Sequence, residues 1–126
     1  MKLILVDDNQ LFRSDLKFFV ENKLNHTVIA EASNGAEFLM LPNIGDADLI
    51  LMDLTMDTMN GFEATQRLLW DYAYSKVIAI TMDTENAILE KLIKTGFRGF
   101  VYKMDIFSLL QETLLKVERG EYVFYG

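Results

Sequence analysis

Residues 49–53 read Leu-Ile-Leu-Met-Asp, four apolar side chains followed by a single carboxylate. The first apolar run of the chain, residues 3–6, ends in the same way, in Asp7 and Asp8. Continuous apolar runs of this length are typical of strands that are buried on both faces of a sheet. Two such strands, each delivering carboxylates at its C-terminal end, predict a site for metal-assisted phosphoryl chemistry.

Two later apolar runs also end in a polar side chain. Residues 78–80 lead into Thr81, and residues 100–102 lead into Lys103. In an open parallel sheet the ligand site lies beyond the carboxyl ends of the strands, near the point where the strand order reverses. All of these polar groups are therefore expected at one edge of the sheet.

The order of the elements predicts the fold class. Strands are expected at residues 3–6, 27–32, 48–52, 77–80 and 99–102. Helices are expected at residues 10–23, 36–41, 61–70 and 85–95, with a last helix that Asp105 caps and Gly120 ends. Strand and helix alternate five times, so we expect an α/β fold, a doubly wound five-stranded parallel sheet with helices on both faces.

Composition limits the classes of function. A chain of 126 residues fits one domain with one core. It has no cysteine, which excludes disulfides and thiolate metal sites. The net charge of -7 argues against direct binding to nucleic acid, whose phosphates require a basic surface. The apolar runs are too short for a signal peptide or a membrane span, so a cytoplasmic location without membrane contact is expected.

Several short motifs match one protein family. They are the acidic pair Asp7-Asp8, the Asp-x-x-Met-x-x-x-x-Gly segment at 53–61, the hydroxyl residue Thr81, and Gly-Phe-x-x-Lys at 99–103. In this order and at these spacings the chain resembles the receiver domain of two-component response regulators. The resemblance covers essentially the whole chain and implies the flavodoxin-like strand order 2-1-3-4-5.

The resemblance implies a role for each acidic residue. Asp53 is expected to accept the phosphoryl group and to bind Mg²⁺ together with Asp8. Asp7 is expected to act through water, and the backbone carbonyl of Thr55 to fill another position. The physics agrees, because carboxylates 4 Å apart repel by about 4 kcal/mol per pair at an effective dielectric near 20. Such a cluster needs a cation, and carboxylate oxygens select a hard ion such as Mg²⁺.

The remaining site residues are expected to sense the phosphoryl group. The Lys103 ammonium would neutralise its oxygens, and Thr81 would donate a hydrogen bond to one of them. Phe100, three residues before the lysine, stands where a ring often follows the movement of the hydroxyl in receivers. The output face is then expected on the fourth helix, the fifth strand and the last helix.

The chain departs from the receiver pattern at several positions. Asp57 and Met104 stand where many receivers have proline. A cis bond before a non-proline residue costs about 2.5 to 4 kcal/mol, so we expect a trans bond between Lys103 and Met104. Thr55 and Asp83 occupy positions that tune the lifetime of the acyl phosphate in receivers.

The resemblance also implies partners. The phosphodonor would be a histidine kinase or a phosphotransfer protein, and phosphorylation would produce a homodimer. The ending Gly-Glu-Tyr-Val-Phe at 120–124 is similar to receivers that precede a helix-turn-helix DNA-binding domain of the LuxR/NarL type. Residues 1–126 would then be the receiver, with the DNA-binding output domain absent from this chain. Such a receiver phosphorylates and dephosphorylates itself and is not a turnover enzyme.

Three alternatives remain open. The chain could be a stand-alone receiver, or a pseudo-receiver that binds partners without phosphorylation. It could also be a Mg²⁺-dependent phosphohydrolase of the haloacid dehalogenase kind, but that family requires an aspartate where Thr55 stands.

Some residues have only structural expectations. His26 is expected in a surface turn, and four methionines are expected to pack around the site: Met52, Met56, Met59 and Met82. The tail at 121–126 has no assigned role.

Overall fold

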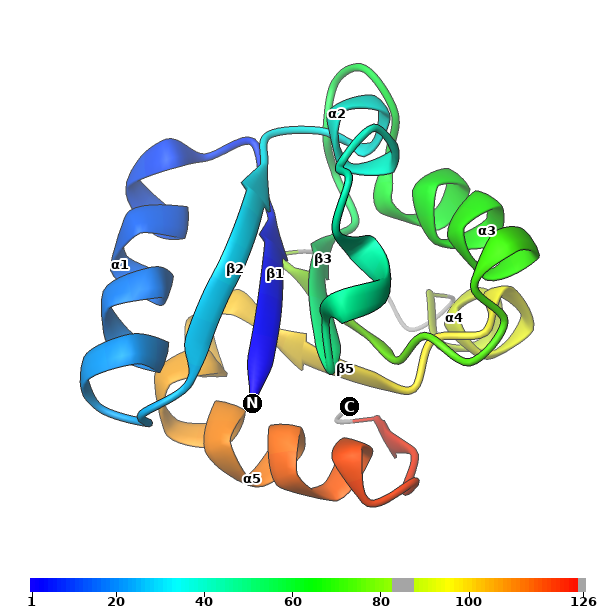
Figure 1. The fold of residues 1–126 in the computed structure, drawn as a ribbon. Helices are drawn as coiled ribbons and strands as arrows, with labels where there is room; N and C mark the ends of the chain where they lie inside the picture. The colour runs from blue at the N-terminus through cyan, green and yellow to red at the C-terminus, as the bar shows by residue number, and fades with distance from the viewer. Residues whose placement is uncertain (83–87, 125–126) are drawn as a thin grey trace.

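The computed structural model describes residues 1–82 and 88–124. Six parallel strands form one sheet in the order β2-β1-β3-β4-β5-β6 (Figure 1). The strands are β1 (Lys2–Val6), β2 (Thr27–Ala32), β3 (Leu49–Asp53), β4 (Val77–Thr81), β5 (Gly99–Tyr102) and β6 (Val123–Phe124). The α/β class and the order of the first five strands are confirmed. The expected number of five strands was wrong.

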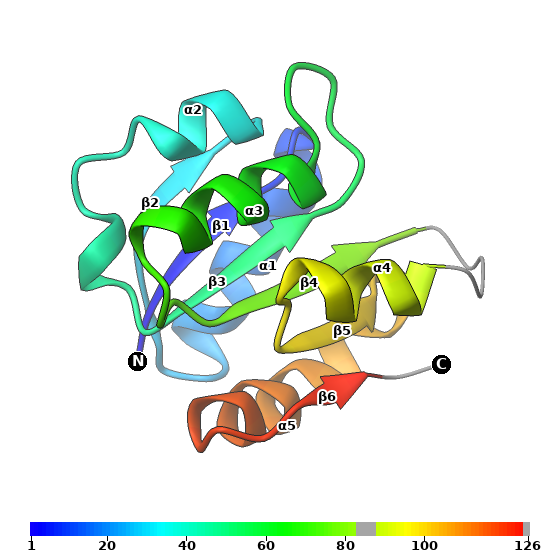
Figure 2. The same ribbon diagram turned by 90° about the vertical axis from the view of Figure 1, so that its right-hand side faces the viewer.

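Helices cover both faces of the sheet, as expected. Figure 2 shows α2 (Gly35–Leu39), α3 (Gly61–Asp71) and α4 (Ile88–Thr95) on the face turned to the viewer. On the other face lie α1 (Gln10–Asn22) and α5 (Ile106–Glu118). Alternate strand residues point to opposite faces, so Ile4 and Val6 join the α2–α4 core while Leu3 and Leu5 join the α1–α5 core.

Asparagine side chains start three of the helices. The side chains of Asn9, Asn34 and Asn60 accept hydrogen bonds from the backbone N–H groups three residues later, at the beginnings of α1, α2 and α3. Asn9 is therefore the residue that caps α1. With Asn34 as its cap, α2 begins at Gly35, one residue earlier than expected.

Asp105 does not cap the last helix as expected. Residues Lys103–Asp105 form a short 3-10 helix, η2, that leads directly into α5, and the Asp105 side chain makes no capping hydrogen bond. A capping residue usually has extended backbone, whereas Asp105 has φ -106° and ψ 2°. The far end of α5 follows the expectation, because Gly120 adopts the left-handed φ of 96° that glycine tolerates. The described residues contain no cis peptide bond, so the Lys103–Met104 bond is trans, as expected.

The tail that had no assigned role supplies β6. Val123 donates its N–H to the Arg98 carbonyl at 3.0 Å, and Phe124 pairs in register with Phe100 of β5. The Arg98 guanidinium lies 5.1 Å from the centre of the Tyr122 ring. A strand of two residues has no periodicity to detect in sequence, so the sequence pattern does not predict β6. The edge of β5, part of the expected output face, is therefore covered by β6.

Smaller expectations also change. His26 is half-buried and its Nε2 lies 2.9 Å from Oε1 of Gln111 on α5, so it is not a free surface residue. Met52 and Met56 are buried and Met59 packs against the same core, but Met82 is 66% exposed. Asp83 and the expected helix start at Glu85 lie outside the described residues.

A second 3-10 helix, η1 (Ile44–Asp46), precedes β3 and was not expected. Among the described residues, no helix combines the length and apolar character needed to cross a membrane.

Candidate functional site

Parallel strands bring the predicted polar residues to one edge of the sheet. Asp53 is the last residue of β3 and Thr81 the last residue of β4, while Asp7 and Lys103 directly follow β1 and β5. The register pairs Val6 with Met52 and Asp53 with Ile80, so these strand ends are level. Asp7, Asp53 and Thr81 are all buried.

Three of the carboxylates form a cluster. Oxygen atoms of Asp7, Asp8 and Asp53 all lie within 4.8 Å of one another. Asp8 is exposed, so the cluster is open to solvent on one side. Backbone N–H groups hold the buried pair, with Asn9 donating to Asp7 Oδ1 at 2.9 Å and Thr55 donating to Asp53 Oδ1 at 3.3 Å.

Lys103 supplies positive charge to this cluster. Its Nζ lies 2.8 Å from Asp7 Oδ2 and 3.4 Å from Asp53 Oδ2. The ammonium also lies 4.6 Å from the centre of the Phe12 ring, and only 11% of the side chain is exposed. The sequence predicted Lys103 as a site residue but not Phe12, because Phe12 follows the ordinary apolar pattern of α1.

One ammonium does not balance the buried carboxylates. Burial, and after it repulsion by Asp7, raises the pKa of Asp53 to about 7 from its ordinary 3.8, although Lys103 and the Thr55 N–H oppose the shift. A divalent cation bound to the clustered oxygens would relieve this repulsion. The donor set therefore fits a hard, oxygen-seeking ion of the Mg²⁺ type.

The loop after Asp53 is tied tightly to the sheet. Leu54 donates its N–H to the Ile80 carbonyl at 3.1 Å, and Gly61 donates to the Leu54 carbonyl at 3.2 Å. A Cβ atom at Gly61 would lie only 2.2 Å from the Asp53 carbonyl oxygen. Glycine is therefore required at this position, because α3 begins directly against the backbone of the candidate acceptor.

Aromatic contacts connect the site to the far edge of the sheet. Thr81 pairs in register with Tyr102, whose ring packs edge-on against Phe100 at a centroid distance of 4.7 Å. Phe100 is 2% exposed and pairs in register with Phe124 of β6. Tyr102 was not singled out in the sequence, because a half-buried tyrosine beside a lysine has no distinctive pattern.

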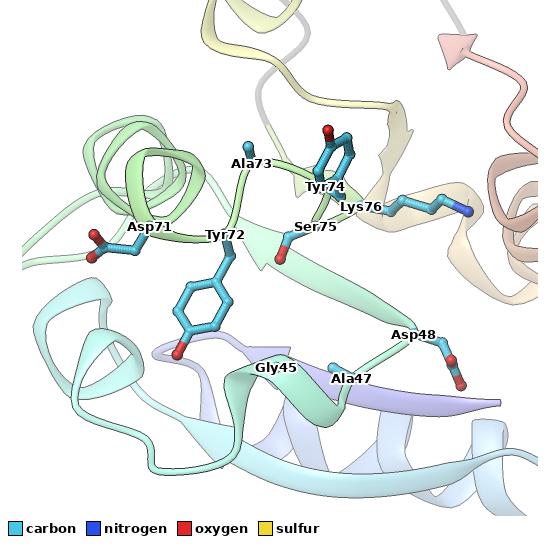
Figure 3. A pocket seen from close by; sticks show the side chains of 9 residues that line it. All are labelled: Gly45, Ala47, Asp48, Asp71, Tyr72, Ala73, Tyr74, Ser75 and Lys76. Atoms are coloured by element: carbon cyan, nitrogen blue, oxygen red, sulfur yellow. The ribbon is translucent and has the colours of Figure 1, made fainter.

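A hollow of about 440 Å³ opens beside the Lys103 ammonium. Its lining is mainly apolar and comes from Asn9, Phe12, Met82, Lys103, Met104 and Phe107. A second hollow, of about 540 Å³, lies between η1 and the turn after α3 (Figure 3). Tyr72 points into it and Gly45 and Asp48 lie along its other side, but it contains no predicted site residue.

The carboxylate cluster, the lysine and the strand-end hydroxyl agree with one known family. Residues 3–114 match the response regulator receiver domain. This chain belongs to the receiver domain family. It is a signalling domain of the two-component type rather than a metabolic enzyme, and membership favours the receiver over the phosphohydrolase alternative.

The curated relatives of this receiver are named as response regulators or transcriptional regulatory proteins. It is 29% identical over 124 residues to the transcriptional regulatory protein DegU of Brevibacillus brevis, covering 98% of this chain and 52% of DegU. It is also 29% identical to the response regulator VraR of Staphylococcus aureus, covering 98% of this chain and 59% of VraR. The receiver thus spans a little over half the length of these relatives.

Solved structures agree on the fold. A LuxR-family two-component response regulator from Aurantimonas sp. SI85-9A1 superposes with a TM-score of 0.89 at 25% identity, over 97% of this chain and 87% of that chain. The non-phosphorylated receiver domain of RcsB from Escherichia coli superposes with a TM-score of 0.87 at 21% identity, over 100% of this chain and 98% of that chain.

Proposed function

We propose that this receiver accepts a phosphoryl group on Asp53 in a Mg²⁺-dependent reaction. The observation that carries the proposal is the position of Asp53, a buried strand-end carboxylate with Asp7 and Asp8 on one side and the Lys103 ammonium at 3.4 Å. Asp8 and Asp53 would hold the ion directly, with Asp7 acting through water and the Thr55 carbonyl as a further ligand. When bound, Mg²⁺ neutralises the carboxylates and the phosphoryl oxygens.

The transfer itself needs little proton chemistry from the receiver. An Asp53 carboxylate oxygen forms a bond to phosphorus while the bond from phosphorus to the donor histidine nitrogen breaks, and the leaving imidazole takes a proton from solvent. Lys103 and the ion supply positive charge to the transferring oxygens, and Thr81 donates its hydroxyl to one of them. The apolar hollow beside Lys103 is the side from which the donor would approach.

The output would pass along the edge of the sheet. Movement of Thr81 toward the phosphoryl group changes the space beside Tyr102, its register partner, and Tyr102 packs on Phe100. Phe100 pairs with Phe124, so β6 would respond together with α4, β5 and α5. A signal passes only if the phosphorylated and unphosphorylated receivers make different contacts with a partner. We propose that α4, β5, β6 and α5 make those contacts.

In the full regulator, residues 1–126 would be the receiver, joined at its C-terminal side to a LuxR-type DNA-binding domain. This rests on DegU, which is named as a transcriptional regulatory protein, and on the share of the relatives that this receiver covers, 52% of DegU and 59% of VraR. DNA would be bound through that domain only. A histidine kinase or phosphotransfer protein would donate the phosphoryl group, and phosphorylation would favour a homodimer.

The decisive experiment is incubation with acetyl phosphate and Mg²⁺, followed by intact mass measurement, with Asp53→Asn as the control. We expect a Mg²⁺-dependent phosphoryl adduct that the variant lacks. An unmodified parent chain would support the pseudo-receiver, and steady release of phosphate would support a phosphohydrolase. Mass is a better readout than tryptophan fluorescence, because Trp70 is 90% exposed near the end of α3, away from Asp53. Sedimentation of the beryllofluoride complex tests dimer formation.

A further inference from the structure

Arg13 is a charged side chain of α1 that the site described above does not use. It lies in the first turns of α1, and only 15% of its side chain is exposed. Its Nη1 donates a hydrogen bond to the backbone carbonyl of Asp7, and its Nε donates to Glu31 Oε1 at 3.0 Å. The guanidinium therefore bridges the end of β1 and the neighbouring strand β2.

This contact gives the carbonyl oxygen of Asp7 a hydrogen-bond partner. The Asp7 N–H donates to the Ala32 carbonyl at 3.0 Å, its Oδ1 accepts from Asn9 at 2.9 Å, and its Oδ2 pairs with Lys103 at 2.8 Å. Arg13 binds the carbonyl oxygen of Asp7, which belongs to the peptide unit that leads into Asp8. The exposed Asp8 carboxylate then depends on this peptide for its direction.

The planar fork of arginine suits this bridge. One guanidinium can donate in two directions at fixed angles, whereas a lysine ammonium on a flexible stem is not preorganised for both acceptors. Glu31 also forms an ion pair with Lys17, whose Nζ lies 3.4 Å from Oε2, so the carboxylate that binds Arg13 has a second partner. Lys17 and Arg13 thus share Glu31 as a partner, but only Arg13 bonds to the Asp7 carbonyl. Lys17 is therefore a matched control for Arg13.

We propose that Arg13 is a positioning residue for the metal site, holding the Asp7–Asp8 backbone so that the Asp8 carboxylate meets the same ion as Asp53. The inference rests on the proposed Mg²⁺-dependent function. The positive charge of Arg13 alone would weaken Mg²⁺ binding, because a nearby cation repels Mg²⁺, whereas its positioning of the backbone would strengthen Mg²⁺ binding. Charge and positioning therefore predict changes of opposite sign when Arg13 is replaced by a neutral residue.

The test is Mg²⁺ affinity by isothermal titration calorimetry on the parent chain, Arg13→Lys, Arg13→Gln and the control Lys17→Gln, with thermal unfolding as a check on folding. We expect both Arg13 variants to bind Mg²⁺ about 10-fold more weakly, as is usual when a partner of a metal ligand is lost, and Lys17→Gln to stay within about twofold. Glu31→Gln added to Arg13→Lys should cause no further loss, because Glu31 acts through Arg13.

Two results would overturn this proposal while leaving the proposed function intact. Parent-like affinity in Arg13→Lys together with tighter binding in Arg13→Gln would show that only charge matters. Equal weakening by Lys17→Gln would show a general effect of the α1 surface. If Arg13→Gln does not fold, the charge-conserving Arg13→Lys still decides between the two. A parent chain that binds no Mg²⁺ would overturn the proposed function as well, so the two failures are distinguishable.

Discussion

The Lys103 ammonium lies closer to Asp7 than to Asp53, with Nζ–Oδ2 distances of 2.8 and 3.4 Å. By distance, the lysine is therefore mainly the counter-ion of Asp7. A cation bound at the cluster would neutralise part of the Asp7 charge. The Lys103 ammonium would then be available to the phosphoryl oxygens on Asp53. We therefore expect the main partner of Lys103 to change when a cation binds and Asp53 is phosphorylated.

Replacing Lys103 by Ala should destabilise the metal-free receiver by about 3 kcal/mol, because it leaves the buried Asp7 carboxylate unpaired. Mg²⁺ should restore part of the loss and should bind at least as tightly as in the parent chain, because a competing cation is gone. Urea unfolding with and without Mg²⁺ measures both effects. Lys94→Ala, which breaks an exposed pair with Glu90, should cost less than about 0.5 kcal/mol. Equal losses in the two variants would contradict the account.

Replacing Asp53 by Asn should stabilise the metal-free receiver at neutral and alkaline pH. The pKa of Asp53 is raised from 3.8 to about 7 by folding, so its stabilising contribution is present below pH 3.8 and is lost as the pH rises through 7. The variant should exceed the parent by about 1 to 4 kcal/mol above that pH, and the two should converge toward acid pH. Urea unfolding of both proteins across this range tests the sign. A difference that does not vary with pH would refute it.

Gly61→Ala should disrupt the loop that carries Asp53. The added Cβ would lie 2.2 Å from the Asp53 carbonyl oxygen, a backbone atom that cannot rotate away. We expect a loss of about 2 to 3 kcal/mol in the free energy of unfolding and slower phosphorylation by acetyl phosphate. Gly45→Ala is the matched control, because its nearest new neighbour is Tyr72 Cε1 at 3.4 Å. A stable, fully active Gly61→Ala would show that the loop can shift.

Phe124→Ala should loosen β6 without preventing phosphorylation. The ring packs on the α2–α4 core and pairs in register with Phe100, so its loss weakens the hydrogen bond from Val123 to the Arg98 carbonyl. Amide exchange of Val123, followed by NMR, should differ between the free and beryllofluoride-bound parent and should be fast in both states of the variant. Leu115→Ala on the exposed side of α5 serves as control. Identical Val123 exchange in both states of the parent would argue against β6 as an output element.

The sequence predicted most of the fold because its decisive patterns are local. Strands β1 to β5 each lie within a residue of their expected bounds, and all of them except β2 are mainly apolar runs. The errors have a common cause in packing. Asp105 looks like a cap in sequence but lies in η2, and residues 123–124 become a strand only because β5 offers an open edge.

The sequence by itself determined the fold class, the family and the carboxylate, hydroxyl and lysine at the strand ends, because residue type and spacing along one chain carry that information. Only the tertiary structure decided how charge is shared among them. The distances of Lys103 to Asp7 and Asp53, the raised pKa of Asp53 and the Arg13 bridge from Asp7 to Glu31 depend on burial and on contacts between segments far apart in sequence. Electrostatic energies vary steeply with separation and with access to water, and neither quantity is encoded in local sequence.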